Sequence, residues 1–140
     1  MPRVDYIGGM ETTDAVLEAN TDFYVAFARG DGAAMERLWA KGSEVTCIHP
    51  GWQALVGREA VMESWQAILA SPPPVRCIGA RVFLNGTSAH VICYEGVGDG
   101  MLVATNLFVL EDQAWRMIHH QAGPTRTVQD VTPRRDAPVH

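Results

Sequence analysis

"VRCIGARVFL" (residues 75–84) is the first of four strand-like segments that follow one another along the chain. The others are AHVICYEGV (89–97), LVATNLFVL (102–110) and WRMIHHQA (115–122). All four are rich in β-branched or aromatic residues, which favour strands. Their connections contain Asn85-Gly86, Asp99-Gly100 and Glu111-Asp112, and Asn-Gly and Asp-Gly are strong hairpin signals. These residues therefore predict a four-stranded antiparallel meander.

Helical patterns precede the meander. The segment TTDAVLEANTDFYVAFARGDG (12–32) predicts a helix that Gly30 ends, and a short second helix follows Asp31. The segment LVGREAVMESWQAILAS (55–71) predicts a third helix, which the prolines at 72–74 end. Three helices followed by a meander predict an α+β domain. If the antiparallel sheet curves strongly around a helix, the fold becomes a cone with an interior.

The chain has 140 residues, about the size of one domain. We expect residues 1–11 to form a flexible arm, residues 12–124 the folded domain, and residues 125–140 a flexible tail rich in Pro, Arg, Asp and Thr. The apolar fraction of 47% and the charged fraction of 19% are typical of a globular protein.

Charge and composition argue against several kinds of partner. The net charge of −5 disfavours nucleic acids and anionic membranes, which bind basic surfaces. No apolar run reaches the roughly 18 residues of a membrane-spanning helix, and the N-terminus lacks the apolar core of a signal peptide. Three cysteines without a CxxC pair favour reduced thiols and a cytoplasmic location. The histidines are scattered and no glycine-rich phosphate loop is present, so we expect neither a metal nor a cofactor.

Strand alternation indicates which side chains face the interior. Asn106 shares one face with Ala104 and Phe108, while the opposite face of that strand is also apolar. An antiparallel sheet usually leaves one face polar, so two apolar faces predict a homodimer through the outer one. In a regular last strand, only one of the neighbouring His119 and His120 can face the cavity. The polar companion Gln121 favours His119.

The segment SEVTCIHP (43–50) predicts a short strand that ends with His49 just before Pro50, at the rim of the cavity. Trp52 follows outside any regular element, where side chains meet ligands. Glu95 shares a face with Cys93, and a buried carboxylate there can act as an acid or base. A solvated or salt-bridged edge position is the more common role for such a residue.

These positions give a predicted catalytic set of His49, Asn106 and His119. His49 would move a proton near neutral pH, Asn106 would donate its amide to a developing oxyanion, and His119 would orient the substrate or supply a second proton transfer. A hydrogen-bonded structural role is the alternative for each histidine. The predicted ligand-binding residues are Phe23, Tyr24, Trp39, Trp52, Trp65, Phe108 and Gln121.

The order of three segments, ARGD (28–31), ALVGREAVMESW (54–65) and DQAWRMIHHQAGP (112–124), resembles the SnoaL-like branch of the nuclear transport factor 2-like (NTF2-like) superfamily. The resemblance covers residues 12–124. It implies a cone-shaped α+β fold, a deep apolar pocket and, commonly, dimerisation through the sheet. It does not imply one chemistry, because this fold hosts many functions.

Ketosteroid-isomerase-like members place a base carboxylate before a proline, where this chain has His49-Pro50. They have a carboxylic acid where this chain has Asn106, and their helix tyrosine matches Phe23, with Tyr24 one position on. These departures argue against a steroid isomerase activity. The chain is also similar to the association domain of calmodulin-dependent protein kinases, which assembles subunits.

Three functions remain open from the sequence. The first is an enzyme that performs acid–base chemistry on a small apolar organic molecule, as an isomerase, dehydratase, cyclase or hydrolase does. The second is a module that binds a small ligand without turnover. The third is an assembly domain, in which the outer face of the sheet carries the function.

Overall fold

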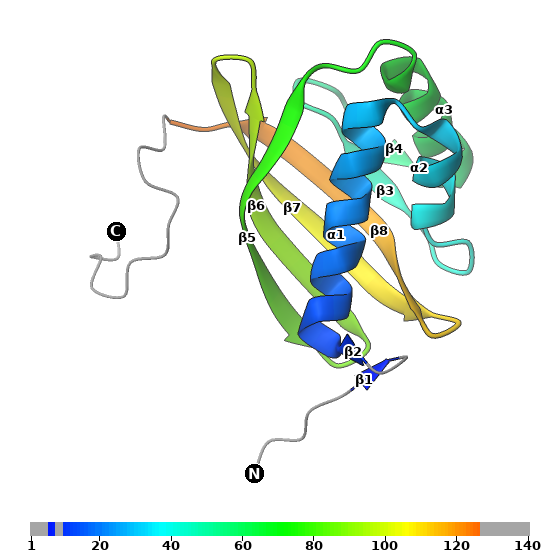
Figure 1. The fold of residues 1–140 in the computed structure, drawn as a ribbon. Helices are drawn as coiled ribbons and strands as arrows, with labels where there is room; N and C mark the ends of the chain where they lie inside the picture. The colour runs from blue at the N-terminus through cyan, green and yellow to red at the C-terminus, as the bar shows by residue number, and fades with distance from the viewer. Residues whose placement is uncertain (1–5, 8–9, 127–140) are drawn as a thin grey trace, which may run out of the picture.

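The computed structural model describes residues 6–7 and 10–126, and its architecture is three helices on a curved sheet (Figure 1). The helices are α1 (Thr12–Arg29), α2 (Gly32–Leu38) and α3 (Arg58–Leu69). The strands are β1 (Tyr6–Ile7), β2 (Met10–Glu11), β3 (Thr46–Ile48), β4 (Leu55–Val56), β5 (Val75–Asn85), β6 (Ser88–Val97), β7 (Gly100–Glu111) and β8 (Ala114–Pro124). The predicted α+β fold class is confirmed.

The main sheet has six strands in the order β4-β3-β8-β7-β6-β5. Strands β5 to β8 form the predicted antiparallel meander, with turns at the three predicted places. The sheet as a whole is mixed, because β3 pairs with β8 in parallel. A parallel pair needs a long crossover, and α3 together with the rest of the meander supplies it.

The sheet bends around α1, which lies across its inner face (Figure 1). One cause of the bend is a bulge in β5, where the pairing with β6 shifts between Ile78 and Arg81. Gly79 inside this bulge has φ 65°, a conformation that glycine adopts without steric cost. The curvature allows the sheet to bury the inward face of α1, including the fully buried Val16 and Phe23.

Gly30 ends α1 as predicted, in a left-handed conformation with φ 66°. Asp31 then begins α2, because its side chain accepts a hydrogen bond from the Ala34 backbone N–H at 3.0 Å. The α1–α2 corner also touches the end of α3. A Cβ atom at Gly30 would lie 2.8 Å from the Leu69 backbone oxygen and 3.3 Å from Pro72 Cγ.

Replacing Gly30 by alanine is therefore expected to lower the free energy of unfolding by about 2 kcal/mol or more. The left-handed conformation costs an L-residue about 1–2 kcal/mol, and the overlap with the Leu69 carbonyl adds to it. Urea denaturation measures the change. Gly32→Ala is the matched control two residues along, since a Cβ there meets nothing within 4 Å. Equal stability of the Gly30→Ala and wild-type proteins would contradict this explanation.

The predicted arm and tail fall mostly on residues 1–5, 8–9 and 127–140, which lie outside the described residues. Within the predicted arm, β1 and β2 pair with each other antiparallel. At the other end, the Thr125 backbone N–H donates to the Met101 carbonyl at 3.2 Å. Among the helices that the structure describes, none has the length and apolar character needed to cross a bilayer.

Candidate functional site

A pocket of about 470 Å³ opens beside Trp52, between α1, α3 and the inner face of the sheet. Its walls include the apolar side chains of Phe27, Ile68, Val97 and Leu102. Its polar lining residues are mainly His49, Glu95 and His120, which are 3%, 2% and 1% exposed, whereas Trp52 is 47% exposed. The polar groups therefore form the floor of the pocket, and Trp52 stands at its mouth.

His120, and not His119, lines this pocket, so the prediction that His119 faces the cavity is wrong. The β7–β8 register pairs Leu107 with His119 but Phe108 with Met117, so β8 carries one extra residue, Ile118, between them. Since side chains alternate along a strand, a bulge of one residue reverses the alternation beyond it. Met117 and His120 are consequently both buried. Outside the pocket, His119 Nδ1 lies 2.6 Å from Thr46 Oγ1.

The position of this bulge has a tertiary cause. On one side of Ile118, the Met117 carbonyl accepts a hydrogen bond from the Ala40 backbone N–H at 3.0 Å, and Trp39 bridges to Met117. On the other side, His119 begins the parallel pairing with β3. The extra residue thus lies where β8 changes from one neighbour to the next.

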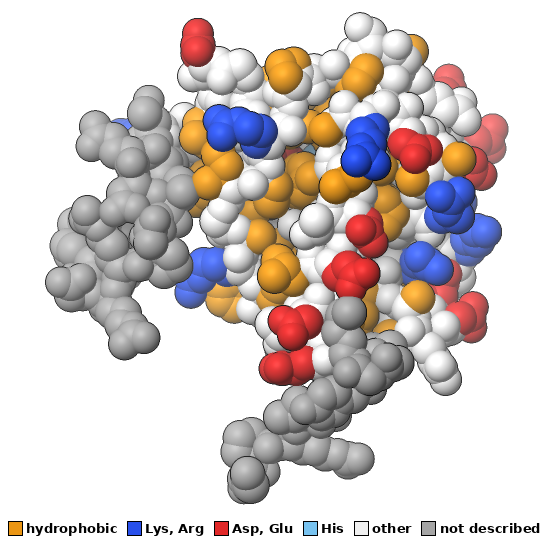
Figure 2. All heavy atoms as spheres, in the orientation of Figure 1, with side chains coloured by type: hydrophobic (Ala, Val, Ile, Leu, Met, Phe, Trp, Pro, Cys, Tyr) orange, Lys and Arg blue, Asp and Glu red, His pale blue; other side chains and the backbone are white. Residues whose placement is uncertain are grey.

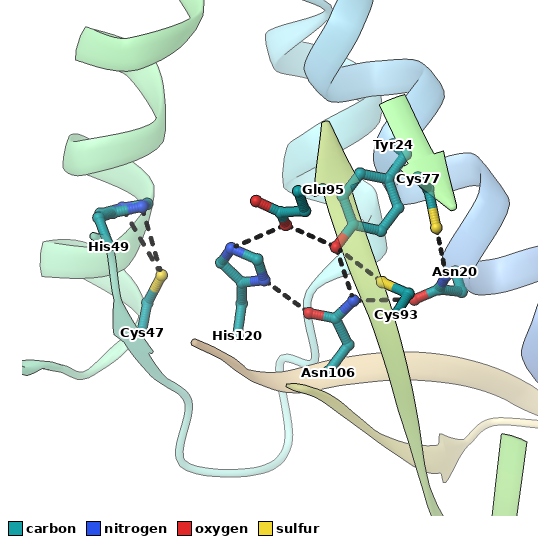
Figure 3. Close-up of polar contacts among 9 residues, drawn as sticks. All are labelled: Asn20, Tyr24, Cys47, His49, Cys77, Cys93, Glu95, Asn106 and His120. Carbon is teal, nitrogen blue, oxygen red and sulfur yellow. Dashed lines mark hydrogen bonds and ion pairs between the residues drawn. The ribbon is translucent and has the colours of Figure 1, made fainter. Parts of the chain in front are cut away.

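Asn106 determines how His120 holds its proton (Figure 3). The Asn106 amide nitrogen donates to Asn20 Oδ1 at 2.9 Å and to Tyr24 Oη at 3.1 Å, so its oxygen is free to accept. That oxygen lies 2.6 Å from His120 Nδ1. A neutral His120 therefore carries its proton on Nδ1 and leaves a lone pair on Nε2, on the side of Glu95 (Figure 3).

The engagement of both amide hydrogens changes the role expected for Asn106. Its side chain is fully buried and does not line the pocket, so its amide has no hydrogen left to donate to a substrate oxyanion. Instead, the Asn106 side-chain oxygen holds the His120 ring in place and fixes its proton on Nδ1.

Glu95 extends from β6 into the same network. Tyr24 Oη donates to Glu95 Oε2 at 2.6 Å, and His120 Nε2 lies 3.8 Å from that oxygen, beyond hydrogen-bond length. Burial raises the pKa of Glu95, although the Tyr24 hydrogen bond opposes the shift. The pKa of Tyr24 is raised well above 10.0, first by burial and then by the Glu95 charge. The second Glu95 oxygen points away from Tyr24 (Figure 3).

Burial lowers the pKa of His120 from 6.5 to about 3, and the nearby His49 and His119 reinforce the shift. Although 3.8 Å is within ion-pair distance, both partners are pushed toward their neutral forms. Burial disfavours charge on either group. The pair is therefore a neutral imidazole beside a carboxyl group that holds its proton more tightly than an exposed glutamate.

His49, which directly follows β3, also lies on this floor and not at the rim where the sequence predicted it. Its Nε2 is 2.9 Å from Ser64 Oγ, and the Ser64 hydroxyl donates to the Val61 carbonyl at 2.7 Å. The serine proton is thus engaged elsewhere, so His49 Nε2 donates. Burial lowers the pKa of His49 to about 4. Trp65 packs against both pocket histidines, with ring centroids 4.8 Å from His49 and 5.7 Å from His120.

The cysteines flank this network as thiols. All three lie within the described residues and are free. Cys93 Sγ is 3.3 Å from Tyr24 Oη, and Asn20 donates to Cys77 Sγ at 3.6 Å (Figure 3). Burial raises the pKa of Cys47 to about 12. Cys47 and Cys93 are both buried, so they contact the network as neutral, polarizable thiols and not as nucleophilic thiolates.

Of the predicted ligand-binding residues, Trp52 lines the pocket. Phe23, Trp65 and Phe108 are buried in the core behind it, and Tyr24 reaches it through Glu95. Gln121 is exposed, with its side-chain oxygen 3.4 Å from His119 Nε2. Trp39 lines a different pocket of about 560 Å³, whose other side chains include Arg37, Lys41, Glu111 and Arg116.

Sequence reasoning left His120 and Glu95 out of the predicted site, although it considered that a buried Glu95 can act as an acid or base. For Glu95, one signal was available: a carboxylate in line with the apolar Val91 and Cys93 on a strand face. For His120 the signal was misleading, because regular alternation placed it outward. Within residues 6–7 and 10–126, no group of three or more His, Cys, Asp or Glu side chains is arranged to hold a metal ion.

On the face drawn in Figure 2, basic and acidic side chains are interspersed among apolar ones. This face therefore lacks the continuous basic surface that nucleic-acid binding requires.

Comparison with known proteins identifies relatives of this fold. Residues 16–126 match the model of the SnoaL-like domain. The F-box protein SKIP8 of Arabidopsis thaliana is 28% identical over 115 residues, which are 79% of this chain, and the chain spans about half (50%) of that protein's length.

Two solved structures are also similar. A Streptomyces avermitilis protein, provisionally assigned as a dehydratase of the NTF2-like family, has a TM-score of 0.75 and 30% identity, covering 82% of this chain and 96% of that one. A Thiobacillus denitrificans protein, provisionally assigned as a calcium/calmodulin-dependent protein kinase type II association domain, has a TM-score of 0.65 and 28% identity, covering 77% of this chain and 93% of that one. With its curved sheet around α1 and its match over most of its length, the chain belongs to the SnoaL-like domain family of the NTF2-like superfamily.

Proposed function

We propose that this domain binds a small, largely apolar organic molecule in the pocket beside Trp52 and transfers protons to and from it. The observation that carries the proposal is the His120–Glu95 pair, 3.8 Å apart on the floor of that pocket. One group offers a lone pair on a fixed nitrogen, and the other is a carboxyl group whose pKa is raised by burial. A base and an acid of this kind, side by side, are the requirement for general acid–base catalysis.

Dehydration is the reaction type that the pair supports best. His120 Nε2 takes the proton from the carbon next to a ligand carbonyl, and the freed electron pair forms the new carbon–carbon double bond. Glu95 gives its proton to the departing hydroxyl, which leaves as water. Transfer of the proton from His120 to the Glu95 carboxylate then restores the pair. The dehydratase assignment of the Streptomyces avermitilis relative is consistent with this scheme.

The test uses a panel of aryl β-hydroxy ketones in deuterium oxide, followed by mass spectrometry. We expect protein-dependent exchange of the hydrogens next to the carbonyl, together with loss of water, for at least one compound. Thermal shift on the same panel reports binding separately, because a ligand that binds only the folded state raises its melting temperature. Compounds that bind but neither exchange nor lose water would favour a module that binds without turnover.

Two other expectations stay predictions. A homodimer through the outer face of the sheet is supported by exposed apolar side chains there, among them Ile92 and Val103, at 37% and 36%. An assembly role would use the same face, and the Thiobacillus denitrificans relative provisionally assigned as an association domain is consistent with it. A cytoplasmic location also remains a prediction.

A further inference from the structure

The charges around the pocket limit what it can hold. Among the described residues, none of those lining the pocket is a lysine or an arginine. Its titratable lining residues are His49, Glu95 and His120, and all three are buried. A ligand carboxylate or phosphate on the floor would lose its hydration without gaining a cationic partner. Burying such an unpaired ion costs several kcal/mol.

The positions of the protons on the pocket floor also disfavour an anionic ligand. His49 gives its Nε2 proton to Ser64, and His120 gives its Nδ1 proton to Asn106. Both imidazoles are neutral near pH 7, because burial holds the pKa of His49 at about 4 and that of His120 at about 3. Glu95 is the third polar group on the floor, and one of its oxygens already accepts a hydrogen bond from Tyr24. An anion would therefore meet the lone pair of His120 Nε2 and the carboxyl group, and neither carries a positive charge.

We propose that the pocket selects an uncharged molecule with a hydroxyl group, which forms a hydrogen bond with Glu95, and rejects the corresponding carboxylate. The inference rests on the proposed function, because it names the ligand class of the same site. The apolar walls formed by Phe27, Ile68, Val97 and Leu102 enclose the hydrocarbon part of the ligand. Trp52, whose ring centroid lies 4.8 Å from that of His49, covers it at the mouth.

The experiment measures the affinity of the wild-type protein for matched compounds by calorimetry at neutral pH. The probes are benzyl alcohol, naphthylmethanol and biphenylmethanol, each compared with its carboxylate (benzoate, naphthoate, biphenylcarboxylate) and with its methyl-substituted hydrocarbon. We expect the best alcohol to bind at least about 100-fold more tightly than its carboxylate, because the ion loses its hydration. We expect it to bind about tenfold more tightly than its hydrocarbon, which has no hydroxyl group to form a hydrogen bond with Glu95.

The outcomes separate this inference from the proposed function. A carboxylate that binds as tightly as its alcohol overturns the charge selection and leaves the proposed pocket standing. Absence of binding by all nine compounds overturns the pocket itself, and with it the inference.

A variant pair tests the cause of the selection. Leu102→Arg places a cation on the wall of the pocket and is expected to strengthen carboxylate binding about tenfold or more, by pairing the buried ion. Leu110→Arg is the matched control on the same strand, since Leu110 is 37% exposed and lies outside the pocket lining. Equal carboxylate affinity in the two variants would show that the missing cation is not what excludes anions.

Discussion

Replacing His120 by glutamine is expected to slow solvent-deuterium exchange into a bound β-hydroxy ketone by about 10²- to 10⁴-fold, the usual contribution of a general base. The glutamine amide can still donate to Asn106 Oδ1, which lies 2.6 Å from His120 Nδ1 in the native protein. What the variant lacks is a lone pair that can take up a proton. The loss should therefore appear in turnover, while binding of the ketone changes much less.

His119→Gln is the matched control for this prediction. It makes the same change one residue earlier in β8, where the side chain contacts Thr46 outside the pocket. Its exchange rate should equal that of the wild-type protein. Thermal denaturation of both variants checks that each is folded. If His119→Gln lost as much activity as His120→Gln, the assignment of the base to the pocket side of the bulge would be wrong.

Acidification is expected to destabilise the folded protein by several kcal/mol through its two buried histidines. The unfolded chain binds protons on histidine with a pKa near 6.5, whereas the folded pKa is about 4 for His49 and about 3 for His120. Below about pH 6.5 the unfolded state takes up protons that the folded state excludes. The free energy of unfolding therefore falls as the pH falls, by about 1.4 kcal/mol per pH unit for each histidine.

The protonation of Glu95 opposes this loss of stability over part of the pH range. Its pKa is raised above 4.5 in the folded state, so its stabilising contribution is present below pH 4.5 and is lost as the pH rises through the folded pKa. On acidification, this gain partly offsets the effect of the histidines down to pH 4.5. Below that value Glu95 is protonated in both states and no longer offsets the effect of the histidines.

Urea denaturation of the wild-type and His49→Gln proteins, from about pH 7 to about pH 3, isolates one histidine. The stability difference between the two proteins should change by about 1.4 kcal/mol per pH unit between pH 6.5 and about pH 4, and stay constant above pH 6.5. Other carboxylates titrate equally in both proteins and cancel in the difference. Parallel curves over the whole range would mean that His49 binds its proton as readily in the folded chain as in the unfolded one.

Much of the fold could be predicted from local patterns. The three hairpins follow from turn residues at Gly86, Asp99 and Asp112, and the end of α1 follows from Gly30. These features depend on interactions between residues a few positions apart, so the sequence contains their cause. The end of β3 near His49 was also predictable, because a proline and a glycine follow directly, but the burial of His49 on the floor and not at the rim was not.

The polar floor of the pocket was harder to predict from the sequence, because its contacts join distant segments of the chain. Tyr24 meets Glu95 across 71 positions, and Asn106 meets Asn20 across 86. Whether a carboxylate at position 95 lies in solvent or under a helix depends on how far the sheet curves around α1. No local pattern contains that information.

The sequence by itself determined the α+β class, the meander and the positions of its turns, since strand and turn preferences act over a few neighbouring residues. Only the tertiary structure decided which histidine of β8 faces the pocket. Side chains alternate with a period of two, so one extra residue at Ile118 exchanges the faces of everything beyond it. That residue is accommodated where β8 passes from Trp39 and Ala40 to β3, a boundary set by segments about 70 to 80 positions away in the chain.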